Sequence, residues 1–302
     1  MLNILIKAGS YVAIILLGIL LRRIGFFKES DFSVLSKIVI KVTLPAALIV
    51  NAATRELNPQ LLTIALLGFG GGVIYVAAGW LTGRRAGKET QAFNMLNHAG
   101  YNIGLFAIPF TESFLGATGV MTASIFDVGN AFICLGGAYG VASAVKDGTG
   151  FDLKRVLKAL AVSVPFLVHI GTVVLNLLHV PFPAPIVDCA RIVANANSFL
   201  AMLMIGVGFK LNLEKGQLGS IARILLVRYG IAAVLALCFW FLLPFDATVR
   251  LSLVILAFSP IGAAAPGFTE EMKGDAGLAC SINSMSILIS IIAIVTLLVT
   301  LL

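Results

Sequence analysis

The chain has 302 residues, of which 59% are hydrophobic and only 12% are charged, and its mean hydropathy is +1.04. A soluble globular protein carries about twice this share of charged residues. The composition therefore excludes a soluble globular protein and requires a lipid bilayer around most of the surface. The net charge of +7 does not call for nucleic acid as a partner, because the basic residues follow the membrane topology.

Ten apolar stretches are long enough to cross a bilayer, which takes roughly 20 predominantly apolar residues per helix. The first ends at Arg22 and Arg23 without a small-residue cleavage site, so it is interpreted as a membrane helix and not as a signal peptide. The longest polar link falls at mid-chain and divides the sequence into residues 1–150 and 151–302. The predicted spans are residues 4–21, 32–52, 59–83, 90–114, 117–145, 159–178, 184–208, 221–243, 251–271 and 276–301.

Basic residues gather in alternate loops. Fourteen lie in the loops after the odd-numbered helices, whereas the other loops hold only Arg55 and Arg250. Because cytoplasmic loops collect Lys and Arg, we expect a multi-pass protein of the cell (inner) membrane with both termini on the non-cytoplasmic side. The fourteen are Arg22, Arg23, Lys28, Arg84, Arg85, Lys88, Lys146, Lys154, Arg155, Lys158, Lys210, Lys215, Arg223 and Lys273. Five further basic residues lie within spans, namely Lys7, Lys37, Lys41, Arg191 and Arg228.

A segment of the fourth predicted helix recurs in the ninth, 158 positions later. Residues 102–119 and 260–277 are identical at eight of eighteen positions, including an ungapped Phe-Thr-Glu triplet. Each half holds five helices, which is an odd number, so the second half must enter the membrane inverted. Inverted repeats of this kind are the plan of many secondary transporters.

Glycine and proline interrupt both repeated helices. They are Gly100, Gly104 and Pro109 in the fourth helix, and Pro260, Gly262, Pro266 and Gly267 in the ninth. Proline removes a backbone donor and glycine loosens the chain, so we expect both helices to break near the membrane centre. Bare backbone there must be buried in protein or line a cavity, and the amide ends of half-helices favour anions. The alternative is that each proline merely kinks a structural helix.

The candidate substrate-binding residues lie at these breaks or on neighbouring spans. At the breaks they are Asn102, Ile103, Gly104, Pro109, Pro260, Gly262 and Pro266. Asn283 follows the second break, Asn51 lies at the end of the second span, and Lys41 within that span is a candidate to meet a substrate carboxylate.

Ionisable groups inside spans are costly and usually functional, so they are the candidates for coupling to an ion or a proton. They are Asp127, Glu112, Glu270 and His98, with Thr111 beside them. Each has a structural alternative. Asp127 is also suited to cap a helix or pair with a lysine, Glu112 and Glu270 to complement a half-helix dipole, and His98 to pack as a hydrogen-bonded histidine.

Other chemistry has no support in the sequence. Motifs of the HExxH, GxSxG and P-loop types are absent, and three scattered histidines give no metal-ligand spacing. The four cysteines lie in apolar stretches without a CxxC pair, which favours buried small hydrophobes over ligands. We therefore expect no enzymatic activity, no cofactor and no bound metal.

The sequence contains the motifs Asn102-Ile103-Gly104, Ile108-Pro109, Leu115-Gly116 and Phe126-Asp127-Val128-Gly129-Asn130, together with Leu44-Pro45 and the proline-rich ninth helix. These motifs resemble the signature of the auxin efflux carrier family, within the bile acid/arsenite/riboflavin-type transporter superfamily. The ten-helix arrangement extends the resemblance over essentially the whole chain. One departure is Pro260 at the position equivalent to Asn102, so a side-chain amide there comes from one half only.

The resemblance implies an all-α fold of two inverted five-helix repeats with broken, crossing fourth and ninth helices. It further implies that helices 1, 2, 6 and 7 form a scaffold and that helices 3–5 and 8–10 form a moving transport domain. Organic anions would be the substrates, and related carriers often form homodimers.

The leading interpretation is a secondary active transporter of small organic anions or carboxylates, working by elevator-type alternating access at the crossover of helices 4 and 9. Coupling is to a proton, to sodium or absent. A sodium-coupled, bile-acid-like symporter is the alternative within the same class, and a membrane sensor or channel is the alternative from another class.

Overall fold

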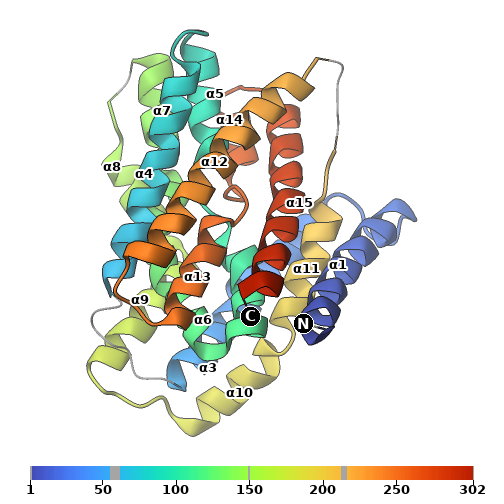
Figure 1. The fold of residues 1–302 in the computed structure, drawn as a ribbon, viewed down its shortest axis with the longest axis vertical. Helices are drawn as coiled ribbons and strands as arrows, with labels where there is room; N and C mark the ends of the chain where they lie inside the picture. The colour runs from blue at the N-terminus through green and yellow to red at the C-terminus, as the bar shows by residue number, and fades with distance from the viewer. Residues whose placement is uncertain (1, 55–61, 149, 212–215, 302) are drawn as a thin grey trace.

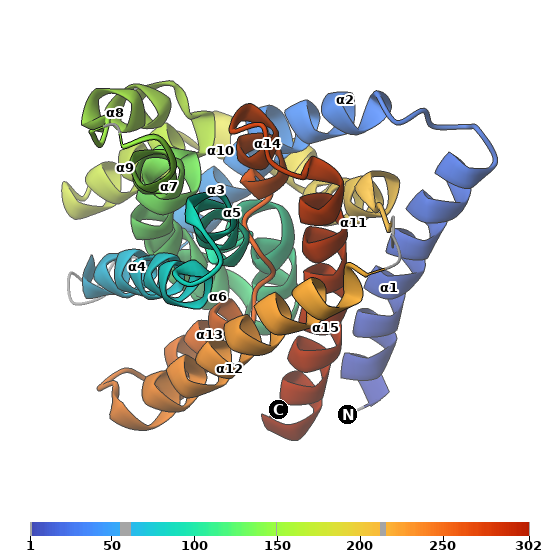
Figure 2. The same cartoon turned by 90° about the horizontal axis from the view of Figure 1, so that it is seen from above.

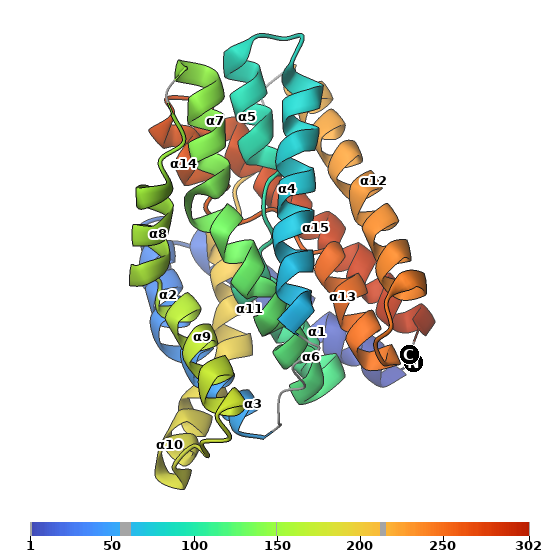
Figure 3. The same cartoon turned by 90° about the vertical axis from the view of Figure 1, so that its left-hand side faces the viewer.

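The computed structural model describes residues 2–54, 62–148, 150–211 and 216–301, so Arg55 and Lys215 of the loop-charge pattern lie outside the described residues. Within these ranges the chain is helical and contains no strand. The helices run side by side in an elongated bundle (Figure 1), and the two termini lie close together (Figures 1 and 3).

The described part of the first half contains seven α-helices and three π-helical turns. They are α1 (Leu2–Arg23), α2 (Asp31–Ile38), η1 (Val39–Thr43), α3 (Leu44–Ala53), α4 (Thr63–Gly83), α5 (Lys88–His98), η3 (Ile103–Ala107), α6 (Ile108–Phe132), η4 (Ile133–Gly137) and α7 (Ala138–Asp147). The second half is formed by α8 (Leu153–Val162), α9 (Val164–Leu177), α10 (Ala184–Ala194), α11 (Asn197–Gly208), α12 (Leu218–Leu242), α13 (Ala247–Ala257), α14 (Ala265–Glu271) and α15 (Ala276–Leu301).

Among the described residues, seven helical stretches are long and apolar enough to cross a membrane. The number is eight if α8 and α9, which are bent by 74° to each other, form one span. The prediction of an all-helical, multi-pass membrane protein is thereby confirmed. The expected number of ten differs because the fourth and fifth predicted helices run together in one stretch, Lys88–Asp147, and the ninth is divided into the short helices α13 and α14. The inverted repeat stays a prediction.

The helices form two groups of close neighbours. In one group α1 packs on α11 and α3 packs on α9 and α10; in the other, α4 packs on α5 and α6 and α12 packs on α13. Seen from above, α1 and α4 lie at opposite sides (Figure 2). The predicted assignment of these groups to a scaffold and a transport domain is a matter of motion and stays a prediction.

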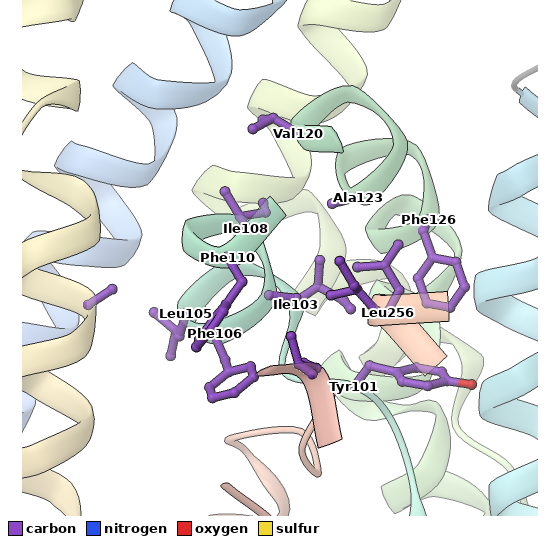
Figure 4. Packing of buried hydrophobic residues seen from close by; sticks show 14 of the residues in the cluster. Tyr101, Ile103, Leu105, Phe106, Ile108, Phe110, Val120, Ala123, Phe126 and Leu256 are labelled. Carbon is purple, nitrogen blue, oxygen red and sulfur yellow. The ribbon is translucent and has the colours of Figure 1, made fainter. Parts of the chain in front are cut away.

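A hydrophobic core surrounds the centre of the bundle. Phe106, Phe110 and Phe126 are fully buried there, and the rings of Tyr101 and Phe126 meet edge-to-face with centroids 5.1 Å apart. Figure 4 shows these aromatic side chains gathered with Ile103 around the non-helical segment that precedes η3. Aromatic contacts of this geometry stabilise beyond the area that they bury, so this irregular backbone is held by packing on several sides.

Candidate functional site

Two helices are interrupted at the centre of the bundle, and their non-helical segments touch. The first interruption lies at residues 99–102, between α5 and η3, and the second at residues 258–264, between α13 and α14. The backbone amide of Asn102 donates to the carbonyl oxygen of Pro260, with an N–O distance of 2.9 Å. The two segments that the sequence marks as repeats therefore meet at one point.

Glycine rather than proline sets the first break. Gly100 has a φ of +69°, a left-handed conformation that favours glycine. Pro109 lies in the first turn of α6, after the π-helical turn in which the Ala107 amide bonds the Asn102 carbonyl five residues earlier. A π turn of this kind relieves the clash and the missing donor that proline brings to a regular α-helix. Pro266 likewise lies in the first turn of α14, where its missing N–H costs nothing.

Cys134 of η4 packs against both breaks. A Cβ atom added to Gly100 would lie 2.3 Å from the Cys134 sulfur, and one added to Gly262 would lie 2.9 Å from it. Real Cβ contacts do not come this close, so neither position accepts a side chain without movement. Because both positions are glycine, the two non-helical segments can pack directly against the Cys134 sulfur.

An asparagine from the following helix braces each break. Asn130 of α6 accepts from the Tyr101 amide and donates to the Tyr101 carbonyl, both at 2.9 Å. Asn283 of α15 donates to the carbonyl oxygens of Ile261 and Gly262, at 3.2 and 3.4 Å. These side chains satisfy backbone groups that have no helical partner, which is required at membrane depth.

Arg228 of α12 joins the carbonyl ends of the two interrupted helices. Its guanidinium donates to the carbonyl of His98, to that of Gly100 at 2.8 Å and to that of Ser259 at 3.1 Å. The side chain is fully buried and lies over the Tyr75 ring, 4.3 Å from its centroid. Both α5 and α13 therefore end at the same cation.

A cavity of about 430 Å³ opens on one side of the meeting point. Asn102, Pro266 and Asn283 of the predicted site line it, and Glu29 and Lys210 lie among its other lining residues. Its volume falls in the range of small-molecule sites. Glu29 and Lys210 form an ion pair, and the Lys210 hydrogen bond holds the pKa of the Glu29 carboxyl below its ordinary value.

A second cavity of about 200 Å³ also adjoins the meeting point. Asn102 lines this cavity as well, together with Ile103 and Gly104 of the predicted site. Asp127 also lines it: one carboxylate oxygen accepts from the Asn130 amide at 2.8 Å, and the other lies 3.9 Å from Nδ1 of His169 on α9. Asn102 thus lines two cavities beside the point where the two interrupted helices meet.

Some predicted substrate residues lie away from these cavities. Lys41 is exposed in η1 and lines neither cavity, so the structure does not support its predicted contact with a substrate carboxylate. Asn51 of α3 donates to Glu112 of α6 at 3.4 Å, outside the crossover. Pro109 and Pro260 are buried and act through their backbone, with the Pro109 carbonyl accepting from Tyr11 at 3.0 Å.

The predicted coupling residues other than Asp127 line neither cavity. The Thr111 hydroxyl bonds carbonyls of its own helix, and His98 Nδ1 lies 2.8 Å from the Asn94 carbonyl. Glu112 accepts from Asn51 and Ser198, and Glu270 is exposed. Within the described ranges, no group of three or more His, Cys, Asp or Glu side chains is arranged to hold a metal ion.

Sequence reasoning did not assign Arg228, Asn130, Cys134 or His169 to the site. Arg228 carried the clearest signal, because a lone arginine in the middle of an apolar span is costly and needs a partner. Asn130 is the last residue of the Phe126–Asn130 motif, but the motif alone did not indicate a role for it. His169 and Cys134 carry no local signal, since only the tertiary fold brings them to the breaks.

Two comparisons with known proteins found similarity to transporters. The family model described as "Membrane transport protein" matches residues 10–144, which include the first break and not the second. An "Uncharacterized transporter" of Methanothermobacter thermautotrophicus (strain ATCC 29096 / DSM 1053 / JCM 10044 / NBRC 100330 / Delta H) is 26% identical over 178 residues. That alignment covers 57% of this chain and 57% of the relative.

Proposed function

We propose that this chain is a secondary active carrier of small organic anions, which the match of residues 10–144 to the family model described as "Membrane transport protein" and the resemblance of its motifs to the auxin efflux carrier family support. Carboxylates are the substrate class, and the site is the crossover of the two interrupted helices. The observation that carries the proposal is the hydrogen bond from Asn102 to Pro260, because it joins the two breaks at a residue that lines two cavities.

Electrostatics at the crossover favour an anion. The first turns of η3 and α14 begin there, and the first amides of a helix have no intrahelical acceptor and carry positive partial charge. Among the residues with a backbone N–H, Ile103 and Gly104 line the smaller cavity and Ala263 lines both, whereas Pro266, which lines the larger one, has no N–H to donate. Asn102 adds a side-chain amide that makes no hydrogen bond to another described residue. A carboxylate bound there would meet donors from both halves of the chain.

The two cavities support alternating access. The larger one is lined by Glu29 and Lys210, which lie in loops that the charge pattern assigns to the cytoplasm, whereas residues of α9 and η1 line the smaller one. In the proposed cycle, α4–α7 and α12–α15 carry the crossover past α1–α3 and α8–α11, so that Asn102 faces one side at a time. Asp127 is the proposed acceptor of a coupling proton.

The test is uptake of benzoate and malonate, as probe mono- and dicarboxylates, by proteoliposomes that contain the purified protein. We expect saturable uptake that disappears in Asn102→Ala. It should persist in the control Asn195→Ala, at an exposed position of the α10–α11 junction. Thermal unfolding with and without each anion measures binding separately, since a ligand of the folded state raises the melting temperature. Uptake that requires sodium would favour the symporter alternative, and equal uptake by Asn102→Ala and wild type would refute the site.

A further inference from the structure

Arg228 has a role that anion binding alone does not explain. It is fully buried at the middle of α12, and it lines neither cavity at the crossover. Among the described residues no carboxylate forms an ion pair with it. Its hydrogen-bond acceptors are instead three backbone carbonyls, two from the end of α5 and one beyond the end of α13.

These acceptors compensate the charge of the guanidinium. The carbonyl end of a helix carries a negative partial charge equivalent to about half an electron. Two such ends meet at Arg228, so together they balance roughly one positive charge. Tyr75 and Tyr101 add the negative faces of their rings, with centroids 4.3 and 5.6 Å from the guanidinium carbon. A buried arginine is tolerated here because the breaks themselves supply its counter-charge.

We propose that Arg228 is the positioning residue of the crossover. It fastens the carbonyl ends of both interrupted helices and cancels their negative partial charge, so that the positive amide ends of the same breaks act unopposed on an anion. The inference rests on the proposed function for its anion, whereas the fastening of the two helices does not depend on it. A side chain on α12 thus fixes the geometry of a site that it never contacts.

The fixed geometry of arginine is suited to this task. The guanidinium is planar and presents several donors in a rigid fork, whereas the lysine ammonium is a point charge on a flexible stem. Two nitrogen atoms of Arg228 reach three carbonyls from two helices. We therefore expect Arg228→Lys to retain the charge and lose part of the fastening, and Arg228→Gln to lose the charge.

The decisive experiment is chemical rescue in the full-length protein. Arg228→Gly opens a space shaped for guanidinium, and guanidinium chloride at about 10 mM, far below the molar range in which it denatures proteins, is compared with equal tetramethylammonium chloride. Guanidinium is expected to raise the melting temperature of Arg228→Gly and not that of the wild type or of Arg223→Gln, an exposed arginine on the same helix. Equal effects of the two salts on Arg228→Gly would overturn the proposal.

Transport kinetics provide the second measurement. A merely structural role of Arg228 would leave KM unchanged. For benzoate uptake, Arg228→Gln is expected to raise KM about tenfold, which corresponds to about 1.4 kcal/mol of binding, with Arg228→Lys intermediate and Arg223→Gln unchanged. A lower amount of folded protein with an unchanged KM in both Arg228→Gln and Arg228→Lys would refute the electrostatic role. If the wild type binds no carboxylate, the proposed function fails, and guanidinium-specific stabilisation of Arg228→Gly would still establish the fastening of the two helices.

Discussion

The backbone amide of Asn102 donates to the carbonyl oxygen of Pro260 at 2.9 Å, although the two residues are 158 positions apart in the chain. They occupy the same position in the two copies of the repeated segment. The two copies therefore contact each other at equivalent residues. The bond uses only backbone atoms. The side chains at the two positions are therefore available for separate roles. Mutation of each residue can test its role separately.

Asn102→Ala is expected to abolish carboxylate uptake and leave folding intact. The substitution keeps the backbone bond to Pro260 and removes a side-chain amide that lines both cavities. Removing one hydrogen bond to a charged ligand costs about 1.5–3 kcal/mol, or roughly ten- to more than a hundredfold in affinity. Uptake and the melting temperature of the purified variant are measured together, with Asn195→Ala as the control. Wild-type uptake would remove Asn102 from the site.

Pro260→Ala is expected to impair transport by a different route. Proline disfavours helical backbone in the residue before it, here Ser259, and so helps to keep residues 258–264 non-helical. Alanine would allow α13 to extend by a turn and move the carbonyl that Asn102 needs. The measurement is uptake by folded protein, with Pro181→Ala, outside the crossover, as the control. Transport at the wild-type rate would mean that the break does not depend on this proline.

The packing of Cys134 predicts a rescue pair. Gly262→Ala places a Cβ 2.9 Å from the Cys134 sulfur. Overpacking of a tight site lowers the free energy of unfolding by about 1–3 kcal/mol, and we expect a loss of this size here. Cys134→Ala removes the sulfur and should restore most of the melting temperature in the double variant. Gly100→Ala should not be restored equally, because its φ of +69° strains any residue that has a Cβ. Equal behaviour of the two glycine variants would contradict this distinction.

The Glu29–Lys210 ion pair predicts an acid-dependent loss of stability. The Lys210 hydrogen bond and charge lower the pKa of Glu29 from its ordinary value of 4.5. A carboxyl whose folded-state pKa is lowered stabilises the protein above its unfolded-state pKa, and this contribution is lost as the pH falls through the lower, folded-state value. The pair is largely exposed, so the effect is small and screened by salt.

The measurement is the melting temperature of the wild type and of Glu29→Gln between about pH 7 and pH 3.5 in low salt. The wild type should be the more stable near neutral pH, and the difference should close below about pH 4.5. Asp147→Asn, at an exposed position at the end of α7, serves as the control. A difference that is constant with pH would show that the ion pair contributes nothing to stability.

The positions of the breaks were predictable, whereas most of their contacts were not. Gly100, Pro266 and the repeated Phe-Thr-Glu are local signals, and local backbone chemistry decides where a helix ends. The face of a span is harder to predict. Lys41 lies in the π turn η1, and a π turn shifts the angular phase of the residues that follow it, so a regular helical period does not give the directions of the side chains in this span. Arg228 finds its partners in α5 and beyond α13, and no periodicity within α12 encodes that contact.

Asp127 provides the final prediction, which concerns coupling. Its carboxylate lines the smaller cavity with Tyr101, Cys134 and His169, the other titratable side chains of that lining. Asn130 bonds one oxygen of Asp127 and also braces the first break, so a change of charge at Asp127 is connected to the crossover through a single side chain. His169 lies on α9, which the proposed cycle assigns to the opposite domain. Protonation of Asp127 would alter its interaction with His169, and with it the contact between the two moving parts.

Asp127→Asn is therefore expected to make uptake independent of external pH between about 5.5 and 8, and to abolish proton movement that accompanies benzoate uptake. His169→Gln should shift the pH profile without abolishing it, because the proton acceptor remains. Uptake of labelled benzoate and a pH-sensitive dye inside the proteoliposomes measure the two fluxes in the same sample. Asp188→Asn, at an exposed position on α10, controls for the loss of a carboxylate. A wild-type pH profile in Asp127→Asn would exclude this residue as the coupling site, because the remaining amide cannot take up a proton in this range.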